Sequence, residues 1–389
     1  MGTPAALRRE LTDLLDRGCP EPERPAIAGR PVFILAPESA LGKLFVPGVL
    51  ARLKNPVAMV DDISTAAVIH GIPRWSAFQF LQKAGAIRGA LAIDFSASRF
   101  AGALFGRLAL KAGVERVDFV AAHAEFGLPA VFETAPKTRA MTLAAIDRFL
   151  ALEHRLADDL SRAVLYAALL LRINYDRAPL RDLLTGGEDE YFCAGPAGHT
   201  FRLGTNEAFC DLGAHIGLLT CKFLAATDWR YRAAHVYEPD RINYRALSKL
   251  RLLPLHDFRL RNKAVSDTRE TLAFVESGSA SSYVSDSGTS TCESVLLDDE
   301  IEELSFIKMD IEGFETRALR GARRIVSACS PRMAITAYHY PLDLPDIVDT
   351  LDAIRPGYFL RLRQHYNFYY DTVLYASPRN DWDPGETAS

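Results

Sequence analysis

Short apolar runs alternate with amphipathic stretches in the first third of the chain. Val32–Ala36 is a continuous apolar run, as in a strand buried on both faces of a parallel sheet. A helical pattern follows to about Leu53. Further strand candidates, separated by helical patterns, are Val57–Val60, Ala90–Phe95 and Val117–Ala121. This alternation predicts a doubly wound α/β sheet. We therefore expect an N-terminal helix and tail over residues 1–29 and a Rossmann-like domain over 30–130.

A different pattern covers residues 139–173. Apolar residues recur there at steps of three and four, which predicts a helical stretch with one apolar face. They are Ile146, Phe149, Leu152, Leu156, Leu160, Val164, Ala167 and Leu171. We expect a helical linker over residues 131–185.

Strand and helix patterns resume after Tyr191 and continue to the end of the chain. The strand candidates are Phe209–Leu212, His235–Glu238, Leu304–Asp310 and Met333–Tyr338, and the helical patterns lie near Leu218–Ala226, Asn243–Leu250 and Phe314–Ala328. Two runs around His365, Tyr358–Leu362 and Phe368–Tyr375, predict a closing β-hairpin. The Ser- and Gly-rich segment Ser277–Thr291 predicts a loop or an irregular strand pair. Residues 186–389 are expected to form a second α/β domain with an antiparallel edge.

Composition excludes several classes of protein. The net charge of −4 gives no basic footprint for nucleic acid. The six cysteines show neither zinc-site nor disulfide spacing, which is typical of a reducing compartment. The first 20 residues lack the apolar stretch of a secretory signal. The longest apolar run, Ala163–Leu171, is far shorter than the ~20 residues of a bilayer span. We therefore expect a cytoplasmic protein without a membrane span.

The first chemical motif is FCDLGAHIG, which begins at Phe209. A strand ends there in an acid, Asp211, and the turn Gly213-Ala214-His215-Ile216-Gly217 leads into a helix. Glycine at such a turn lets the backbone approach a ligand closely, and the helix start offers unpaired N–H groups. The spacing differs from the dinucleotide fingerprint GxGxxG. It suits a ligand with an amino-acid part and a ribose, such as S-adenosylmethionine, although a tight structural turn has the same pattern.

Two further strand ends support a ligand site. The next strand ends in Glu238-Pro239, where an acid is placed to hold the two hydroxyls of a ribose. In the run NKAVSD, Ala264 and Val265 are small and apolar enough to border a flat base. An ordinary strand followed by a turn would show the same NKAVSD pattern.

The candidate catalytic residues follow the last two predicted parallel strands. FIKMDIEGFE delivers Asp310 and Glu312 to the carboxyl end of a buried strand, and AYHYP delivers His339 to the same edge. Ligands of open α/β sheets bind at that edge. Two acids at this position are difficult to explain by packing, because acids are rarely buried without a partner.

These motifs, in the order FCDLGAHIG, VYEP, NKAVSD, LLDD, FIKMDIEGFE, LRGA and AYHYP, resemble those of the FkbM-type methyltransferases. FYYDTVLYA is similar to that family's closing hairpin, so the resemblance covers roughly residues 191–377. It implies a class I methyltransferase sheet of seven strands and S-adenosylmethionine as methyl donor. It also implies O-methylation of a hydroxylated small molecule, a sugar, glycan or polyketide.

Carried over by position, the resemblance implies that Asp211, Gly213 and Gly217, with Ala214, line the methionine side of the donor. Glu238, followed by Pro239, would hold the ribose, and Ala264, with Val265, would border the adenine. His339, Asp310 and Glu312 are the candidate bases for the acceptor hydroxyl, and Asp310 would alternatively contact the donor or orient His339. The same three side chains could hold a divalent metal, but we predict a site without one.

Two other function classes stay open. The first is an oxidoreductase that binds NAD or a nucleotide sugar in the N-terminal domain. Its first turn, APESALG, lacks the glycines of a dinucleotide loop, so we expect a degenerate scaffold or an acceptor-docking domain instead. The second is a binding protein with an inactive methyltransferase fold, which the presence of both acids and His339 disfavours.

Overall fold

The computed structural model describes residues 3–22, 25–129, 131–193, 199–278, 282–285 and 287–380. The chain forms two compact units. The first contains Met1–Ala144, Tyr166–Leu183 and Asn367–Tyr369, and the second contains Ala145–Leu165, Leu184–Tyr366 and Tyr370–Ser389. The segment that we expected to be a linker, 131–185, thus contributes residues to both units. The predicted domain boundaries stay a prediction.

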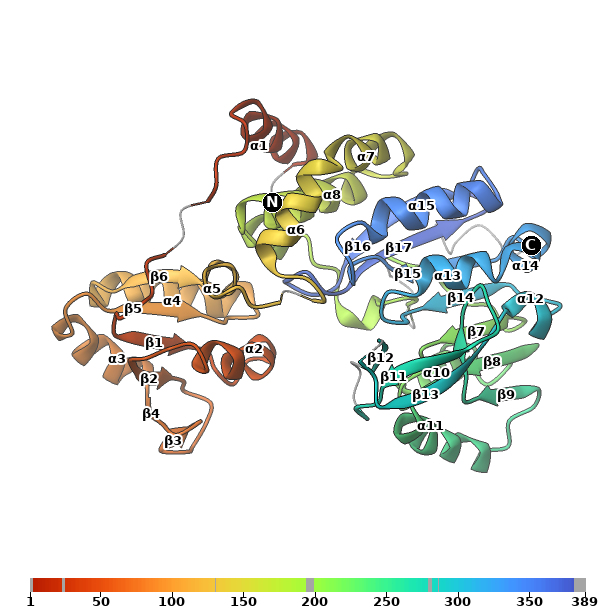
Figure 1. Cartoon of the computed structure of the whole chain (residues 1–389), viewed down its shortest axis with the longest axis horizontal. Helices are drawn as coiled ribbons and strands as arrows, with labels where there is room; N and C mark the ends of the chain where they lie inside the picture. The colour runs from red at the N-terminus through yellow and green to blue at the C-terminus, as the bar shows by residue number, and fades with distance from the viewer. Residues whose placement is uncertain are drawn as a thin grey trace. The chain divides into compact units, whose positions relative to one another are not determined.

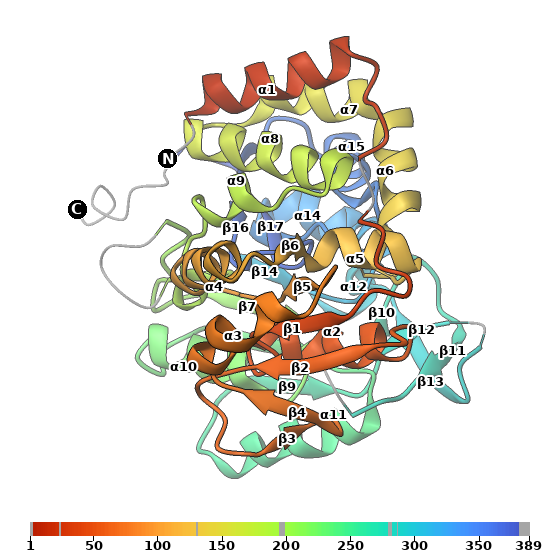
Figure 2. The same ribbon diagram turned by 90° about the vertical axis from the view of Figure 1, so that its left-hand side faces the viewer.

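The first unit is built on a six-stranded sheet in the order β3-β4-β2-β1-β5-β6 (Figure 2). Its strands are β1 (Val32–Leu35), β2 (Pro56–Val60), β3 (Val68–Ile69), β4 (Ile72–Trp75), β5 (Leu91–Asp94) and β6 (Glu115–Asp118). All neighbouring pairs are parallel except β3 and β4. The predicted Rossmann-like sheet is confirmed.

Helices cover both faces of this sheet. They are α2 (Ala40–Leu50), α3 (Ala77–Lys83), α4 (Arg99–Ala112) and α5 (Phe119–Phe126), and the unit also contains α1 (Pro4–Asp16), α6 (Ala135–Ala144), α9 (Ala178–Arg181) and a 3-10 turn over Ala84–Ala86. On one face Phe33 of β1 meets Phe80 of α3 edge to face at 5.0 Å. On the other face Phe45 of α2 stacks on Phe119 of α5 at 5.4 Å. The apolar strands are therefore buried on both sides, as their continuous runs predicted.

The last strand of this unit ends earlier than predicted. We expected a strand near Val117–Ala121, but Asp118 ends β6 and α5 begins at Phe119. The reason is local, because the Asp118 side chain accepts a hydrogen bond from Val120 N at 3.0 Å and so caps the helix. The apolar residues after Asp118 face the core from a helix.

The predicted helical stretch over 139–173 is mainly helical, but it is broken into several elements. It consists of α6, α7 (Ile146–Ala151), a 3-10 turn (Leu152–Arg155) and α8 (Asp159–Asn174). Leu156 is extended and forms an isolated bridge with Leu360. Asp158 then accepts a hydrogen bond from Ser161 N at 2.8 Å, which caps the start of α8. Apolar periodicity could not reveal this break, because the apolar spacing continues through it.

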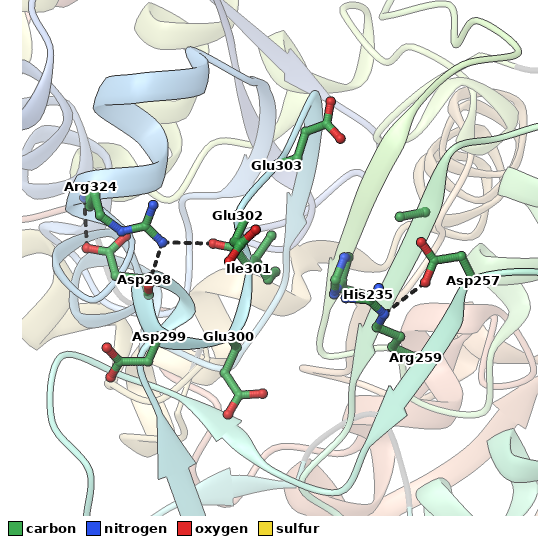
Figure 3. Close-up of a pocket in the computed structure, with 11 residues that line it drawn as sticks. His235, Asp257, Arg259, Asp298, Asp299, Glu300, Ile301, Glu302, Glu303 and Arg324 are labelled. Atoms are coloured by element: carbon green, nitrogen blue, oxygen red, sulfur yellow. Dashed lines mark hydrogen bonds and ion pairs between the residues drawn. The ribbon is translucent and has the colours of Figure 1, made fainter.

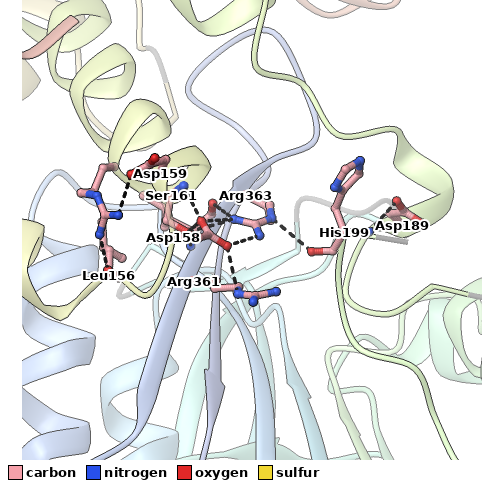
Figure 4. Close-up of polar contacts among 10 residues, drawn as sticks. Leu156, Asp158, Asp159, Ser161, Asp189, His199, Arg361 and Arg363 are labelled. Carbon is pink, nitrogen blue, oxygen red and sulfur yellow. Dashed lines mark hydrogen bonds and ion pairs between the residues drawn. The ribbon is translucent and has the colours of Figure 1, made fainter. Parts of the chain in front are cut away.

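Asp158 also ties this helical segment to a strand of the same unit (Figure 4). Arg363 donates to Asp158 Oδ2 at 2.7 Å, and Arg361 lies 2.9 Å from the same oxygen. Ser161 accepts a hydrogen bond from Leu362 N at 2.9 Å. Burial opposes ionisation of Asp158, but the hydrogen bonds and charge of Arg363 outweigh it and lower its pKa to about 2.

The second unit contains a seven-stranded sheet in the order β16-β17-β15-β14-β7-β8-β9. Its strands are β7 (Ala208–Leu212), β8 (Ala233–Tyr237), β9 (Phe258–Arg261), β14 (Phe306–Met309), β15 (Arg332–Thr336), β16 (Phe359–Gln364) and β17 (Thr372–Ser377). β17 runs antiparallel to both of its neighbours, β15 and β16, and the other neighbouring pairs are parallel. The predicted seven-stranded fold with an antiparallel edge is confirmed. The connection between the two strands of the closing hairpin is longer than predicted. The second strand, β17, begins at Thr372 and not at Phe368.

Helices lie on both sides of this sheet (Figure 1). α10 (Leu218–Ala226) and α11 (Arg241–Leu247) cover one side, while α13 (Glu315–Arg320), α14 (Arg323–Cys329) and α15 (Asp343–Ile354) cover the other. The helix expected over Phe314–Ala328 is thus broken in two. A Cβ at Gly321 would lie 1.9 Å from Ser266 O, so the chain approaches another backbone closely at the break.

A small four-stranded sheet in the order β10-β13-β11-β12 was not predicted. Its strands are β10 (Ala264–Val265), β11 (Thr271–Val275), β12 (Tyr283–Val284) and β13 (Ser290–Val295), and the unit also holds α12 (Leu297–Glu300) and 3-10 turns over Gly187–Asp189 and Ser248–Leu252. The segment expected to be a loop or strand pair, Ser277–Thr291, contributes β12 and the start of β13. Its residues 279–281 and 286 lie outside the described residues.

Across the described ranges, we find no helix with both the length and the apolar character that crossing a bilayer requires.

Candidate active site

The turn after β7 is set by two glycines with positive φ. Gly213 has a φ of +76°, and a Cβ there would lie 1.9 Å from Asp310 O. Gly217 has a φ of +91°, and a Cβ there would meet the Leu247 side chain at 2.5 Å. Gly213 and Ala214 both donate their backbone N–H to Tyr237 O, at 3.0 and 3.1 Å. The turn therefore holds the ends of β7, β8 and β14 close together.

Asp211 lies inside the sheet rather than on a surface. Its carboxylate is fully buried, with Oδ1 3.3 Å from Lys308 Nζ, and Oδ2 accepts a hydrogen bond from the Thr220 hydroxyl at 2.9 Å. Lys308 Nζ also donates to Gly213 O at 2.6 Å. Burial opposes the charge of Lys308, but Asp211 outweighs it and raises the pKa of Lys308. Asp211 thus fixes the glycine turn, and direct contact with a ligand stays a prediction.

Glu238 follows β8 and closes over the same turn. Its Oε2 accepts a hydrogen bond from His215 N at 2.6 Å, and its Oε1 accepts one from Asp240 N at 2.8 Å. Burial raises the pKa of Glu238 to about 7. Pro239 after it is half-buried. A buried carboxylate held by backbone N–H groups at a strand end has a fixed position from which to accept ligand hydroxyls.

The end of the third strand is tied to Glu238. Asn262 Nδ2 donates to Glu238 O at 2.8 Å and to Pro239 O at 2.9 Å. Ala264 and Val265 follow directly as β10 and are buried. The structure therefore gathers the residues expected to hold ribose and adenine at one edge of the sheet.

Asp310, Glu312 and His339 meet at the carboxyl ends of β14 and β15. His339 Nε2 lies 3.5 Å from Asp310 Oδ1 and 3.5 Å from Glu312 Oε2. The His339 side chain is only 1% exposed, whereas those of Asp310 and Glu312 are 28% and 20% exposed. The two acids therefore face the outside of the cluster, and the histidine lies behind them.

Glu315 is a further member of this cluster that sequence reasoning missed. It is fully buried at the start of α13, and its Oε1 lies 3.2 Å from His339 Nδ1. The same oxygen accepts a hydrogen bond from Ile311 N at 3.0 Å and lies 3.1 Å from the Thr336 hydroxyl. Burial alone would lower the pKa of His339, but the carboxylates around it, Glu315 first, raise it to about 10. His339 is therefore protonated at neutral pH, which disfavours the predicted role as a base.

Three more groups near Asp310 were not predicted as site residues: Glu190 and Tyr191 before the sheet, and Asp371 in the run FYYDTVLYA. The Tyr191 hydroxyl donates to Asp310 Oδ2 at 2.9 Å. Burial, with the charge of Asp310, raises the pKa of Glu190 to about 7. Burial, with the charges of Glu190 and Asp310, raises the pKa of Asp371 to about 8. Asp310 and its neighbours thus disfavour ionisation of Glu190 and Asp371 in one small region.

A separate cavity of about 790 Å³ lies at the opposite ends of the strands (Figure 3). It is lined by residues before β14 and at the starts of β8 and β9, among them His235. Several of its acids pair with arginines, such as Asp257 with Arg259 at 2.8 Å. None of the predicted site residues lines it, so it is distinct from the candidate active site.

Comparisons with known proteins agree with this geometry. The family model described as methyltransferase FkbM domain matches residues 211–365. This part of the chain is an FkbM methyltransferase domain. It includes the glycine turn, Glu238, and the cluster of Asp310, Glu312 and His339.

A crystal structure of methyltransferase FkbM from Methylobacillus flagellatus KT is similar to the whole chain. The TM-score is 0.78 at 26% identity, and the match covers 96% of this chain and 100% of that one. Aeropyrum pernix fibrillarin, crystallised with S-adenosyl-L-methionine, reaches a TM-score of only 0.31 at 10% identity, over 46% of this chain and 69% of that one. No curated protein matches. The family model and the fold together support a methyltransferase.

Proposed function

We propose that the FkbM domain transfers a methyl group from S-adenosylmethionine to a hydroxyl of a small molecule. We favour a sugar or glycan precursor as the acceptor over a polyketide. The observation that carries this proposal is the convergence of two sets of residues on one edge of the sheet. Gly213 and Glu238 form the first set, and Asp310 and Glu312 form the second. Gly213 lies against the backbone of Asp310, so the two sets are adjacent.

The donor side offers polar and apolar groups suited to S-adenosylmethionine. Gly213 holds the turn against Asp310 O, where a side chain would not fit. Glu238 would accept the ribose hydroxyls, and the apolar pair Ala264 and Val265 would border the adenine. When bound, the donor supplies a methyl group on sulfonium sulfur, and the carbon–sulfur bond breaks with its electron pair on sulfur as the acceptor oxygen bonds to the methyl carbon.

On the acceptor side, Asp310 and Glu312 face the acceptor. Asp310 is the group that would hold the hydroxyl proton, because burial, with the charge of Asp310, raises the pKa of Glu312 to about 8. Both acid side chains are partly exposed, whereas His339 lies behind them and is almost fully buried. An acceptor therefore reaches the carboxylates first. Tyr191 donates a hydrogen bond to Asp310 Oδ2 and leaves Oδ1 directed to the cluster. We assign His339 to positioning these acids. Aligning acceptor and donor is the main task of such a site.

The proposal is tested by transfer of label from methyl-labelled S-adenosylmethionine to a panel of sugars, sugar nucleotides and polyketide alcohols. We expect label in at least one hydroxylated acceptor. Removal of one catalytic proton acceptor typically costs ~10²–10⁴-fold, so Asp310→Asn should lose turnover on that scale. His235→Gln, in the separate cavity, is the matched control. Equal turnover by Asp310→Asn and wild type would remove Asp310 from the mechanism.

No observation favours the alternative of NAD binding in the first unit. Its turn after β1 places the carbonyl oxygens of Ala36 and Pro37 against Gly42, within 2.5 Å of where a Cβ would lie. Gly42 N is already bonded to the Ser39 side chain. A role of this unit as scaffold or acceptor-docking domain stays a prediction.

A further inference from the structure

We propose that Asp310, Glu312 and His339 form a binding site for one divalent transition-metal ion, Mn²⁺ or Zn²⁺, at the methyl-transfer site. Their facing atoms are Asp310 Oδ1, Glu312 Oε2 and His339 Nε2, and the three side chains offer ligand atoms that all lie within 4.8 Å of one another. The cluster mixes one imidazole nitrogen with two carboxylate oxygens. Imidazole suits transition metals and carboxylates suit Mn²⁺, so this donor set favours Mn²⁺ or Zn²⁺ over Ca²⁺.

The spacing of the ligand atoms fits such an ion. His339 Nε2 lies 3.5 Å from each of the two carboxylate oxygens. Metal–ligand bonds of about 2.0–2.2 Å separate neighbouring tetrahedral ligands by roughly 3.4 Å. The two acids are partly exposed, so an ion could enter and keep open positions for water or an acceptor oxygen.

Groups behind these ligands orient the ligand side chains, as in other metal sites. A metal-bound histidine donates its other ring N–H to a carboxylate or carbonyl, which fixes its tautomer. Glu315 Oε1 lies 3.2 Å from His339 Nδ1 and is itself held by Ile311 N. Nε2 is thereby directed to Asp310 and Glu312. Tyr191 holds the second oxygen of Asp310 in the same way, at 2.9 Å.

The carboxylates around the cluster also favour binding of a cation. Asp310, Glu312 and Glu315 surround one imidazole, and Glu190 and Asp371 lie near enough to interact electrostatically with Asp310. A divalent cation would offset the negative charge of these carboxylates.

Binding is tested with the full chain, dialysed first against a chelator and then into metal-free buffer. MnCl2 is titrated while electron paramagnetic resonance follows the free ion, and ZnCl2 is used as competitor. We expect one Mn²⁺ per chain, displaced by Zn²⁺ and not by equal CaCl2. Glu312→Gln should weaken Mn²⁺ binding at least 10-fold, and Glu315→Gln by ~10–100-fold. His235→Gln is the matched control and should bind normally.

A folding defect is separated from a binding defect by melting each variant with and without MnCl2. Wild type and His235→Gln should gain thermal stability with the ion, and Glu312→Gln should not. No bound Mn²⁺ or Zn²⁺ in folded wild type would overturn the site, and so would equal affinity in wild type and Glu312→Gln.

The ion's place beside the acceptor oxygen rests on the proposed function, but its binding does not. S-adenosylmethionine titration of the same dialysed protein separates the two. Metal binding with no donor binding would support this metal site and overturn the proposed function. Donor binding with no metal binding would overturn this site alone.

Discussion

Lys308 and Asp211 are register neighbours on adjacent strands, and their charges lie 3.3 Å apart inside the seven-stranded sheet. Lys308 also donates to the carbonyl oxygens of Leu212 and Gly213, at 3.2 and 2.6 Å. One buried ammonium group thus joins β14 to the carboxylate and the backbone of the glycine turn. This pair explains why a lysine occurs within the apolar run FIKM.

We predict that Lys308→Met lowers the free energy of unfolding by ~3–5 kcal/mol, because it leaves Asp211 buried without its counter-charge. Adding Asp211→Asn should recover part of that loss, since the uncompensated charge is removed. Urea denaturation of both variants measures the two values. Equal stability of wild type and Lys308→Met would show that the pair does not stabilise the turn.

Gly213→Ala should damage both stability and donor binding. The added Cβ meets Asp310 O at 1.9 Å and the residue has a φ of +76°. Gly357→Ala is the matched control, since its φ is +93° and a Cβ there has no neighbour within 4 Å. Left-handed strain alone costs ~1–2 kcal/mol, which we expect for Gly357→Ala. Thermal melts should show a larger loss of stability for Gly213→Ala than for Gly357→Ala. Calorimetry should show that Gly213→Ala reduces donor affinity at least 10-fold. Equal losses would argue against the close approach.

The free energy of unfolding should depend on pH because of Glu238. Burial raises its folded pKa to about 7 from an ordinary value of 4.5. The folded state therefore binds more protons than the unfolded state between these values. The stability contributed by Glu238 is fully present below pH ~4.5 and is lost as pH rises through ~7. Over this window wild type should lose on the order of 3 kcal/mol relative to Glu238→Gln.

Urea denaturation at several pH values checks the Glu238 prediction. Parallel pH profiles for wild type and Glu238→Gln would show that the carboxyl group is not perturbed. Tyr358→Phe serves here as the control, because it leaves Glu238 and its two backbone hydrogen bonds in place and removes no group that titrates between these pH values.

Tyr191→Phe tests whether Asp310 needs its orienting hydrogen bond. We expect kcat to fall roughly 10-fold, the effect of one hydrogen bond to a charged group, with donor affinity unchanged. Tyr358→Phe is the control, since that buried hydroxyl donates to Pro331 O at 3.0 Å, outside the cluster. Steady-state kinetics with donor titration measures both. A change in donor affinity with unaltered kcat would assign Tyr191 to donor binding instead.

The sequence predicts those parts of the fold in which one local pattern decides the outcome. The run from Phe209 to Gly217 predicts a strand, a tight turn and a helix, and all three are present. Breaks that depend on a single capping side chain were missed. Asp118 ends a strand and Asp158 begins a helix within apolar patterns that continue past them. Periodicity does not detect an aspartate that accepts a backbone hydrogen bond.

The candidate site was predictable only where strand ends carry unusual residues. Asp310, Glu312 and His339 follow buried strands, so topology alone brings them together. Glu315 and Tyr191 approach from a helix and from a segment before the sheet, and only folding shows that they contact these residues. Lys308 did carry a signal, since a charged residue within a buried strand requires a partner.

The central claim is that the edge formed by Gly213 and Glu238 binds S-adenosylmethionine. Isothermal titration of the full chain with S-adenosylmethionine, and in parallel with NAD, tests it most directly. We predict one donor site per chain, no NAD binding, and affinity at least 10-fold weaker in Glu238→Ala. Folded wild-type protein that binds no S-adenosylmethionine, or that binds only NAD, would contradict the account.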